Sequence, residues 1–150
     1  MHEFLLENVD YYNTIMLSYE IQIRVRYKET DAMGVVHHSN YVNYYEMIRT
    51  EMLRALGTTY KTLESAGVMM PVREVKMNFY TPAYYDDILT VKLTMKEPPG
   101  ARITFEHEIF NEQGNLVNTG SVVLVFMNAA TRKACRPPQW FKDVFAQYFN

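Results

Sequence analysis

An aspartate and two adjacent histidines, Asp31, His37 and His38, lie in a polar loop just before the longest helical pattern of the chain. At the start of a helix, backbone N–H groups lack partners and the helix dipole is positive, so an oxyanion or a polarised carbonyl is stabilised there. A carboxylate beside such a site can attack an acyl group as a nucleophile, or activate water as a general base. We therefore predict acyl-transfer chemistry at this helix start if the loop is compact.

The helix is predicted from the spacing of its apolar residues. They recur at steps of four, three, four and four, which is one face of a helix with a period of roughly 3.6 residues. They are Tyr41, Tyr45, Ile48, Met52 and Leu56. Ser39 or Asn40 can cap the start, and Gly57 fits the left-handed position beyond the end. The helix should therefore begin within a residue or two of His38.

Most of the remaining chain has the alternating pattern of strands with one buried face. This pattern covers residues 19–27, 75–80, 89–96 and 101–109. It places Tyr27 on the buried phase of the first strand. The continuous apolar run at 122–127 predicts a strand that is buried on both faces or lies at the sheet centre. One helix and about five strands joined by short turns predict an α+β domain, with an antiparallel sheet curled around the helix.

Composition limits the class of protein. The 150 residues are 48% apolar and 21% charged, with a net charge of −2, which is ordinary for one globular domain and gives no basic surface for nucleic acid. No apolar run is long enough for a membrane span. The single Cys135 cannot form an internal disulfide, and no residue set has the spacing of a metal site.

The start of the chain lacks the pattern of a secretory signal, so we expect a cytoplasmic protein. We divide the chain into an N-terminal extension (1–17), a folded domain (18–137) and a C-terminal tail (138–150). Met16 directly precedes the first strand pattern, so residues 1–15 are either an extension or precede the native start. The tail has aromatic residues at helical spacing and is predicted to be a short docked helix, which could instead cover an acyl pocket or a subunit interface.

Several of these residues together resemble a known family. The residues are Tyr27, Thr30-Asp31, Gly34-Val35-Val36, His38, Asn40-Tyr41 and Tyr45-Glu46, followed by a weaker element at Tyr80-Thr81-Pro82-Ala83 and Asp86-Asp87. They resemble the hotdog-fold acyl-CoA thioesterases of the 4-hydroxybenzoyl-CoA thioesterase and YbgC type, from about residue 18 to 137. The resemblance implies a hotdog fold, with a five-stranded antiparallel sheet wrapped around one long central helix. It also implies a homodimer that assembles further to a homotetramer, with active sites at the dimer interface.

The resemblance also implies roles for individual residues. Asp31 would be the nucleophile or the general base. The backbone N–H of His38 would hold the thioester carbonyl, and its imidazole would belong to the site. Tyr27 would hydrogen-bond the carboxylate or the substrate, or would simply be a core residue. Glu46, which replaces the loop aspartate in a related branch, is expected here to be structural and to pair with Arg49 or Arg54.

Coenzyme A belongs to the substrate in this reading, so no separate cofactor is expected. Its phosphates need basic side chains on the rim of a cleft, and we assign Arg73, Lys76 and Arg102 to this role. Acyl-carrier-protein thioesters are the other substrate choice. Two different functions stay open: a hotdog dehydratase or hydratase, in which His38 and Glu46 imitate a catalytic pair, and a non-catalytic acyl-CoA-binding protein.

Overall fold

The computed structural model describes residues 16–149, which form one curved antiparallel sheet with a helix across its face. The strand order is β1-β4-β5-β6-β3, so β1 and β3 are the two edges. The strands are β1 (Leu17–Arg24), β3 (Val72–Phe79), β4 (Ile88–Met95), β5 (Arg102–Phe110) and β6 (Leu116–Val125). This confirms the predicted α+β class and the five-stranded antiparallel sheet.

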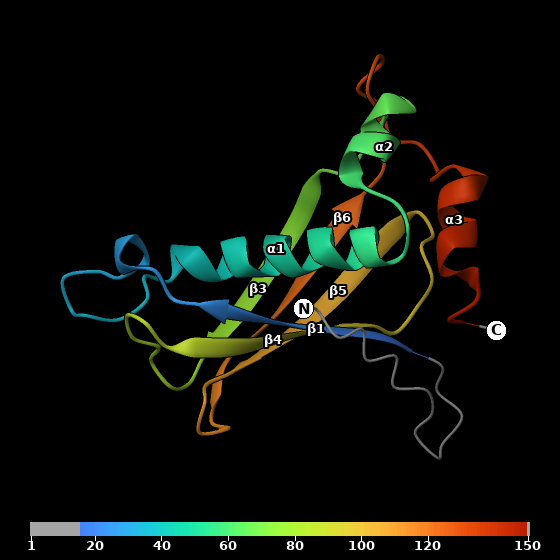
Figure 1. The fold of residues 1–150 in the computed structure, drawn as a ribbon. Helices are drawn as coiled ribbons and strands as arrows, with labels where there is room; N and C mark the ends of the chain where they lie inside the picture. The colour runs from blue at the N-terminus through green and yellow to red at the C-terminus, as the bar shows by residue number, and fades with distance from the viewer. Residues whose placement is uncertain (1–15, 150) are drawn as a thin grey trace.

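Helix α1 (Ser39–Ala55) covers the concave face of the sheet and begins one residue after His38, as predicted. Its buried side includes Tyr41, Tyr45, Ile48 and Met52. These side chains join the alternate residues of the strands in one core. Figure 1 shows that the loop before α1 lies at one end of the molecule, beside the turn that joins β3 to β4.

Smaller elements gather near the other end of α1. They are α2 (Tyr60–Ser65), β2 (Val68–Met69), β7 (Met127–Asn128) and α3 (Gln139–Ala146). Phe141 and Phe145 of α3 are fully buried in the core, so the aromatic spacing of the tail does form a docked helix. Among residues 16–149, no helix is both long and apolar enough to cross a membrane.

A buried polar cluster fixes the middle of α1 to the sheet. The Tyr45 hydroxyl donates a hydrogen bond to Asn118 Oδ1, and the Tyr45 ring stacks on His107 at 4.1 Å and 12°. A Cβ added at Gly120 would meet the Lys76 carbonyl oxygen at 2.6 Å, so only glycine leaves room for the Tyr45 ring. Burial, and then the Arg49 charge, lower the pKa of His107 to about 3. We call Tyr45, His107, Asn118 and Gly120 the Tyr45 cluster.

Two sequence predictions about strands are wrong. The first strand ends at Arg24, so Tyr27 is not on its buried phase. Strand β6 lies between β5 and the edge strand β3 rather than at the centre, and its burial alternates, with Val123 and Val125 partly exposed. A continuous apolar run is therefore compatible with an interior strand that has only one fully buried face.

The proposed division of the chain stays a prediction. The N-terminal extension falls almost entirely on residues 1–15, which lie outside the described residues. The sheet itself begins at Leu17.

Candidate functional site

The polar loop before α1 is compact because it folds back on itself between residues 29 and 37. Thr30 and Val36 form an antiparallel bridge. The Asp31 N–H donates to the Val35 carbonyl at 2.9 Å, and a second backbone hydrogen bond closes the base of the loop. The loop is thus compact, which is the condition that the sequence prediction set.

The Asp31 side chain is only partly engaged. Its Oδ1 accepts the Met33 N–H at 2.8 Å, which is an Asx turn, and its carbonyl oxygen accepts the Gly34 N–H at 2.9 Å. Gly34 has a φ of +79°, a conformation that favours glycine. The second carboxylate oxygen of Asp31 has no hydrogen bond or ion pair among the described residues. Asp31 therefore shapes the turn and still offers one oxygen for chemistry.

The start of α1 leaves one donor free. No hydrogen bond among the described residues uses the His38 N–H. The predicted caps are wrong, because no side chain of Ser39 or Asn40 caps the helix. Instead the Ser39 N–H donates to His37 Nδ1 at 3.2 Å, and the Asn40 amide donates to the Glu29 carbonyl at 2.8 Å. His37 thus caps the helix while His38, which is exposed, presents an unpaired N–H.

The second element of the family resemblance packs against the first. The Val36 N–H donates to the carbonyl of fully buried Ala83 at 2.8 Å, and Val35 forms an isolated bridge with Tyr84. The Tyr84 N–H in turn donates to Asp87 Oδ2 at 2.8 Å. The segment between β3 and β4 therefore supports the Asp31 loop from one side.

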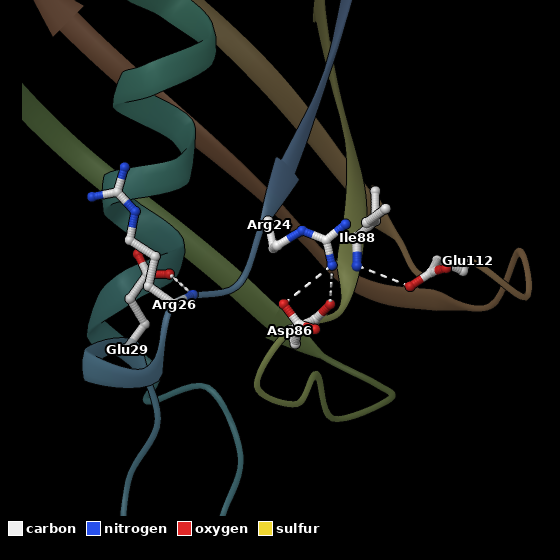
Figure 2. A network of polar contacts seen from close by, with 6 residues as sticks. All are labelled: Arg24, Arg26, Glu29, Asp86, Ile88 and Glu112. Atoms are coloured by element: carbon white, nitrogen blue, oxygen red, sulfur yellow. Dashed lines mark hydrogen bonds and ion pairs between the residues drawn. The ribbon is translucent and has the colours of Figure 1, made fainter.

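Glu29 is a residue that the sequence reasoning missed. Its backbone carbonyl accepts the His37 N–H at 2.9 Å and the Asn40 amide, and its carboxylate accepts the Arg26 N–H at 2.7 Å (Figure 2). Its carboxylate also accepts the Tyr44 hydroxyl at 3.1 Å. Burial, and then the Glu29 charge, raise the pKa of Tyr44. Glu29 follows a strand and precedes the Thr-Asp pair, but nothing in its spacing indicated that it ties the loop to the helix.

Tyr27 lies in a 3₁₀ turn (Tyr27–Glu29) and is 77% exposed. Its ring contacts the Tyr85 ring edge to face at 5.6 Å between centroids. No hydrogen bond joins it to Asp31 among the described residues. The core reading of Tyr27 is therefore wrong, and its hydroxyl is open to a ligand.

The three cations assigned to coenzyme A lie away from the Asp31 loop within one chain. Arg102 and the start of β3 both lie opposite the end of β6. The start of α1 instead contacts the other end of β3, where the centroids of the Tyr41 and Phe79 rings are 5.5 Å apart. Arg73 precedes Phe79 by six residues, which is about 20 Å of extended strand. Lys76 forms an ion pair with Glu74, with 3.2 Å between Nζ and Oε1. A single chain does not bring these residues together with Asp31.

Glu46 does not pair as expected. Arg54 pairs with Glu51, and Arg49 Nε donates to the Tyr60 hydroxyl at 3.1 Å. Glu46 is exposed and has no ion pair among the described residues. It follows His38 by eight residues, about 12 Å along a helix axis. The two side chains therefore do not form the dyad that a dehydratase would need.

No group of three or more His, Cys, Asp or Glu side chains within residues 16–149 has the arrangement of a metal site. The principal cavities of this part of the chain do not include Asp31 or His38.

Comparison with known proteins identifies the family. Residues 25–145 match the thioesterase-like superfamily. The acyl-CoA thioesterase YbgC of Haemophilus influenzae is 37% identical over 139 residues, covering 88% of this chain and 95% of the relative. The acyl-CoA thioester hydrolase YbgC of Escherichia coli O6:H1 is 33% identical over 126 residues, covering 84% and 92%.

The fold agrees with solved structures of the same family. A DHNA-CoA thioesterase from Staphylococcus aureus superposes with a TM-score of 0.81 at 32% identity, covering 87% of this chain and 89% of that structure. The family and the hotdog fold predicted from the residues are thus confirmed. The chain belongs to the thioesterase-like superfamily of hotdog-fold thioester hydrolases.

Proposed function

We propose that the protein hydrolyses an acyl-CoA thioester to the free acid and coenzyme A, with Asp31 and the start of α1 as its catalytic centre. One observation carries the proposal: a carboxylate with an unused oxygen lies in a compact loop that leads into a helix start whose His38 N–H is also unused. The names of the YbgC relatives and of the DHNA-CoA thioesterase support the same class of substrate.

The proposed reaction uses these two groups in turn. Either the free oxygen of Asp31 attacks the thioester carbonyl and forms an acyl-enzyme anhydride that water then hydrolyses, or Asp31 removes a proton from the attacking water. In both cases negative charge develops on the carbonyl oxygen, and the His38 N–H stabilises it with help from the helix dipole. The thiolate of coenzyme A leaves and takes a proton. The exposed His38 ring and Tyr27 hydroxyl would position the substrate.

The proposed active unit is a dimer that uses the edge strand β3. Apolar side chains on the concave side of this strand are left uncovered, with Val72 49% and Phe79 53% exposed. Large exposed apolar surfaces usually have a partner. A second copy pairing along β3 would cover them and continue the sheet, which also removes a free strand edge. The homotetramer and the cytoplasmic location stay predictions.

In a dimer with two-fold β3 pairing, the cations assigned to coenzyme A would lie closer to an Asp31 loop than they do within one chain. Two antiparallel copies of β3 place the start of one strand beside the end of the other. Arg73, and with it Lys76, would then approach the Asp31 loop of the second copy, whereas Arg102 would remain further away on β5. Their proposed role in binding coenzyme A therefore depends on the dimer.

The test is release of free thiol from short, long and aromatic acyl-CoAs by wild type, Asp31→Asn and the surface control Asp143→Asn. We expect Asp31→Asn to fold normally and to lose on the order of a hundredfold or more in turnover, because the amide is neither a nucleophile nor a base. Asp143→Asn should match wild type.

Near-normal hydrolysis by Asp31→Asn would refute the catalytic assignment. Binding of acyl-CoA without thiol release by wild type would favour the non-catalytic function. Formation of an enoyl product from a hydroxyacyl thioester would favour the dehydratase. A carrier-protein thioester in the same panel decides between the two proposed substrate carriers.

A further inference from the structure

A groove of about 900 Å³ runs along the free edge of β1, on the other side of α1 from β3. One wall is the end of β1 and the following turn, residues 22–29, and the other is the flank of α1 at Asn40, Tyr44 and Met47. Its size is in the range of small-molecule sites. We call it the β1 groove. A second copy docked on β3 would leave it open, because β1 and β3 are opposite edges of the sheet.

Three cations line the β1 groove within five residues of sequence: Arg24, Arg26 and Lys28. Arg24 is occupied, since its Nη1 lies 2.8 Å from the Asp86 carbonyl and 3.2 Å from Asp86 Oδ1. Figure 2 shows the Arg26 guanidinium extending away from its own backbone N–H, which is the part joined to Glu29. The side chains of Arg26 and Lys28 have no hydrogen bond or ion pair among the described residues. The lining also includes the carboxylates of Glu29 and Asp86, so its three cations and two carboxylates leave a net charge of +1, and the side chains of Arg26 and Lys28 stay free of ion pairs.

The groove also has an exposed aromatic surface. Tyr27 and Tyr85 line it and are 77% and 56% exposed, with their rings edge to face at 5.6 Å. Exposed aromatic rings beside basic side chains suit a ligand that has a flat heterocycle and phosphates, because bases stack on aromatic faces and phosphates bind Arg and Lys.

One end of the groove lies beside the start of α1. Asn40 lines the groove, follows His38 by two residues, and is hydrogen-bonded to the Glu29 carbonyl at 2.8 Å. A ligand in the groove could thus extend a flexible arm to the His38 N–H. We propose that the β1 groove binds the phosphorylated nucleotide end of coenzyme A through Arg26, Lys28 and the Tyr27–Tyr85 pair. This inference rests on the proposed function, whose thioester carbonyl it places at the helix start.

The first experiment compares an acyl-CoA with the same acyl group on N-acetylcysteamine, a thioester that lacks the nucleotide. In Arg26→Gln/Lys28→Gln we expect the KM for acyl-CoA to rise on the order of tenfold or more, which corresponds to losing charged hydrogen bonds. The kcat for acyl-CoA and the kcat/KM for the short thioester should stay near wild type. Lys61→Gln/Lys142→Gln, which removes the same charge from two exposed helical sites, should change neither substrate.

Three results would overturn the inference. The first is an unchanged KM for acyl-CoA in Arg26→Gln/Lys28→Gln. The second is an equal loss with both thioesters, which would mean that the variant disturbs the catalytic loop. The third is a raised KM in Arg73→Gln/Lys76→Gln/Arg102→Gln with no effect in the groove variant, which would place the nucleotide at the dimer edge.

A binding measurement separates this inference from the proposed function. Calorimetry with adenosine bisphosphate, the nucleotide end of coenzyme A, needs no turnover. Saturable binding that is lost in Arg26→Gln/Lys28→Gln supports the groove even if no thioester is hydrolysed. Hydrolysis of acyl-CoA without such binding overturns the groove and leaves the proposed function intact.

Discussion

A tyrosine and a histidine lie near the start of α1, and another tyrosine and histidine lie at its middle, in opposite surroundings. At the start, Tyr27 is 77% exposed and His38 is exposed as well. In the Tyr45 cluster, Tyr45 and Asn118 are fully buried and His107 is only 2% exposed. The comparison shows that the types of residue do not distinguish a candidate site from a structural joint.

What distinguishes the two regions is whether their polar groups are accessible to a ligand, because both ring nitrogens of His107 are buried. In the Tyr45 cluster the Tyr45 hydroxyl is taken by Asn118, whose amide donates to the Asn78 carbonyl at 3.1 Å. At the helix start, one oxygen of Asp31 and the N–H of His38 have no partner within the described residues. We therefore expect changes at the start to reduce activity, and changes in the cluster to reduce stability.

The largest effect should come from removing the free donor at the helix start. His38 has a φ of −53°, which proline adopts, so His38→Pro removes the N–H with little change of this backbone angle. We expect kcat to fall on the order of a hundredfold or more, as for loss of one oxyanion donor. His38→Ala keeps the N–H and should retain most of the activity. Steady-state kinetics, with circular dichroism to confirm folding, would measure both.

Equal losses in His38→Pro and His38→Ala would contradict this expectation. They would show that the imidazole, rather than the backbone N–H, is the group that matters.

A change in the middle of α1 should have the converse effect. Gly120→Ala places a Cβ 2.6 Å from the Lys76 carbonyl oxygen and 2.7 Å from Tyr45 Cε2. Because backbone on one side and a buried ring on the other must move, we expect the free energy of unfolding to fall by about 2 to 3 kcal/mol. Gly100→Ala is the control, since nothing lies within 4 Å of its added Cβ. Urea unfolding would compare the two variants.

The activity of the molecules that remain folded should be unchanged in Gly120→Ala. A stability no lower than that of Gly100→Ala would mean that the cluster adapts to the extra methyl group. A selective loss of kcat would mean that the cluster positions the helix start as well.

Periodicity predicted the framework of this fold well, because alternation and helical spacing are local properties of the chain. The helix start near His38 follows from the apolar spacing after it, and the strands follow from their alternation. Tyr27 was misplaced because the strand pattern continues to it, whereas the Arg26 N–H turns to bond Glu29. This hydrogen bond to a side chain three residues later overrides the strand pattern, and such a bond leaves no periodic signal in the sequence.

The site was predicted only in part because its geometry depends on strand direction and register. Asp31 and His38 are close in sequence, so a shared site could be proposed from the sequence alone. Arg73 and Arg102 were chosen as basic residues on or near strands that could border the site, and the register that takes them to the far end of the sheet is set by pairing between distant strands. The basic residues of the β1 groove were visible on the polar phase of the first strand, but nothing showed that the flank of α1 forms their opposite wall.

The Tyr45 cluster should make the free energy of unfolding depend on pH. The folded protein binds a proton at His107 only below about pH 3, whereas the unfolded chain binds it below about pH 6.5. Because the unfolded state holds more protons between these values, stability is present above about pH 6.5 and is lost as the pH falls towards 3. As the pH falls from about 7 to about 5, His107 should therefore lower the free energy of unfolding by about 2 kcal/mol.

His107→Phe keeps a ring against Tyr45 and removes this titration, so the variant should lose less stability than wild type over the same pH range, by about 2 kcal/mol. Urea unfolding at the two pH values measures the difference, and His38→Ala controls for an exposed histidine. Parallel profiles for wild type and His107→Phe would mean that the folded protein admits the proton despite Arg49 beside it. In that case the middle of α1 would exchange protons with the solvent, and burial would not separate it from the exposed helix start.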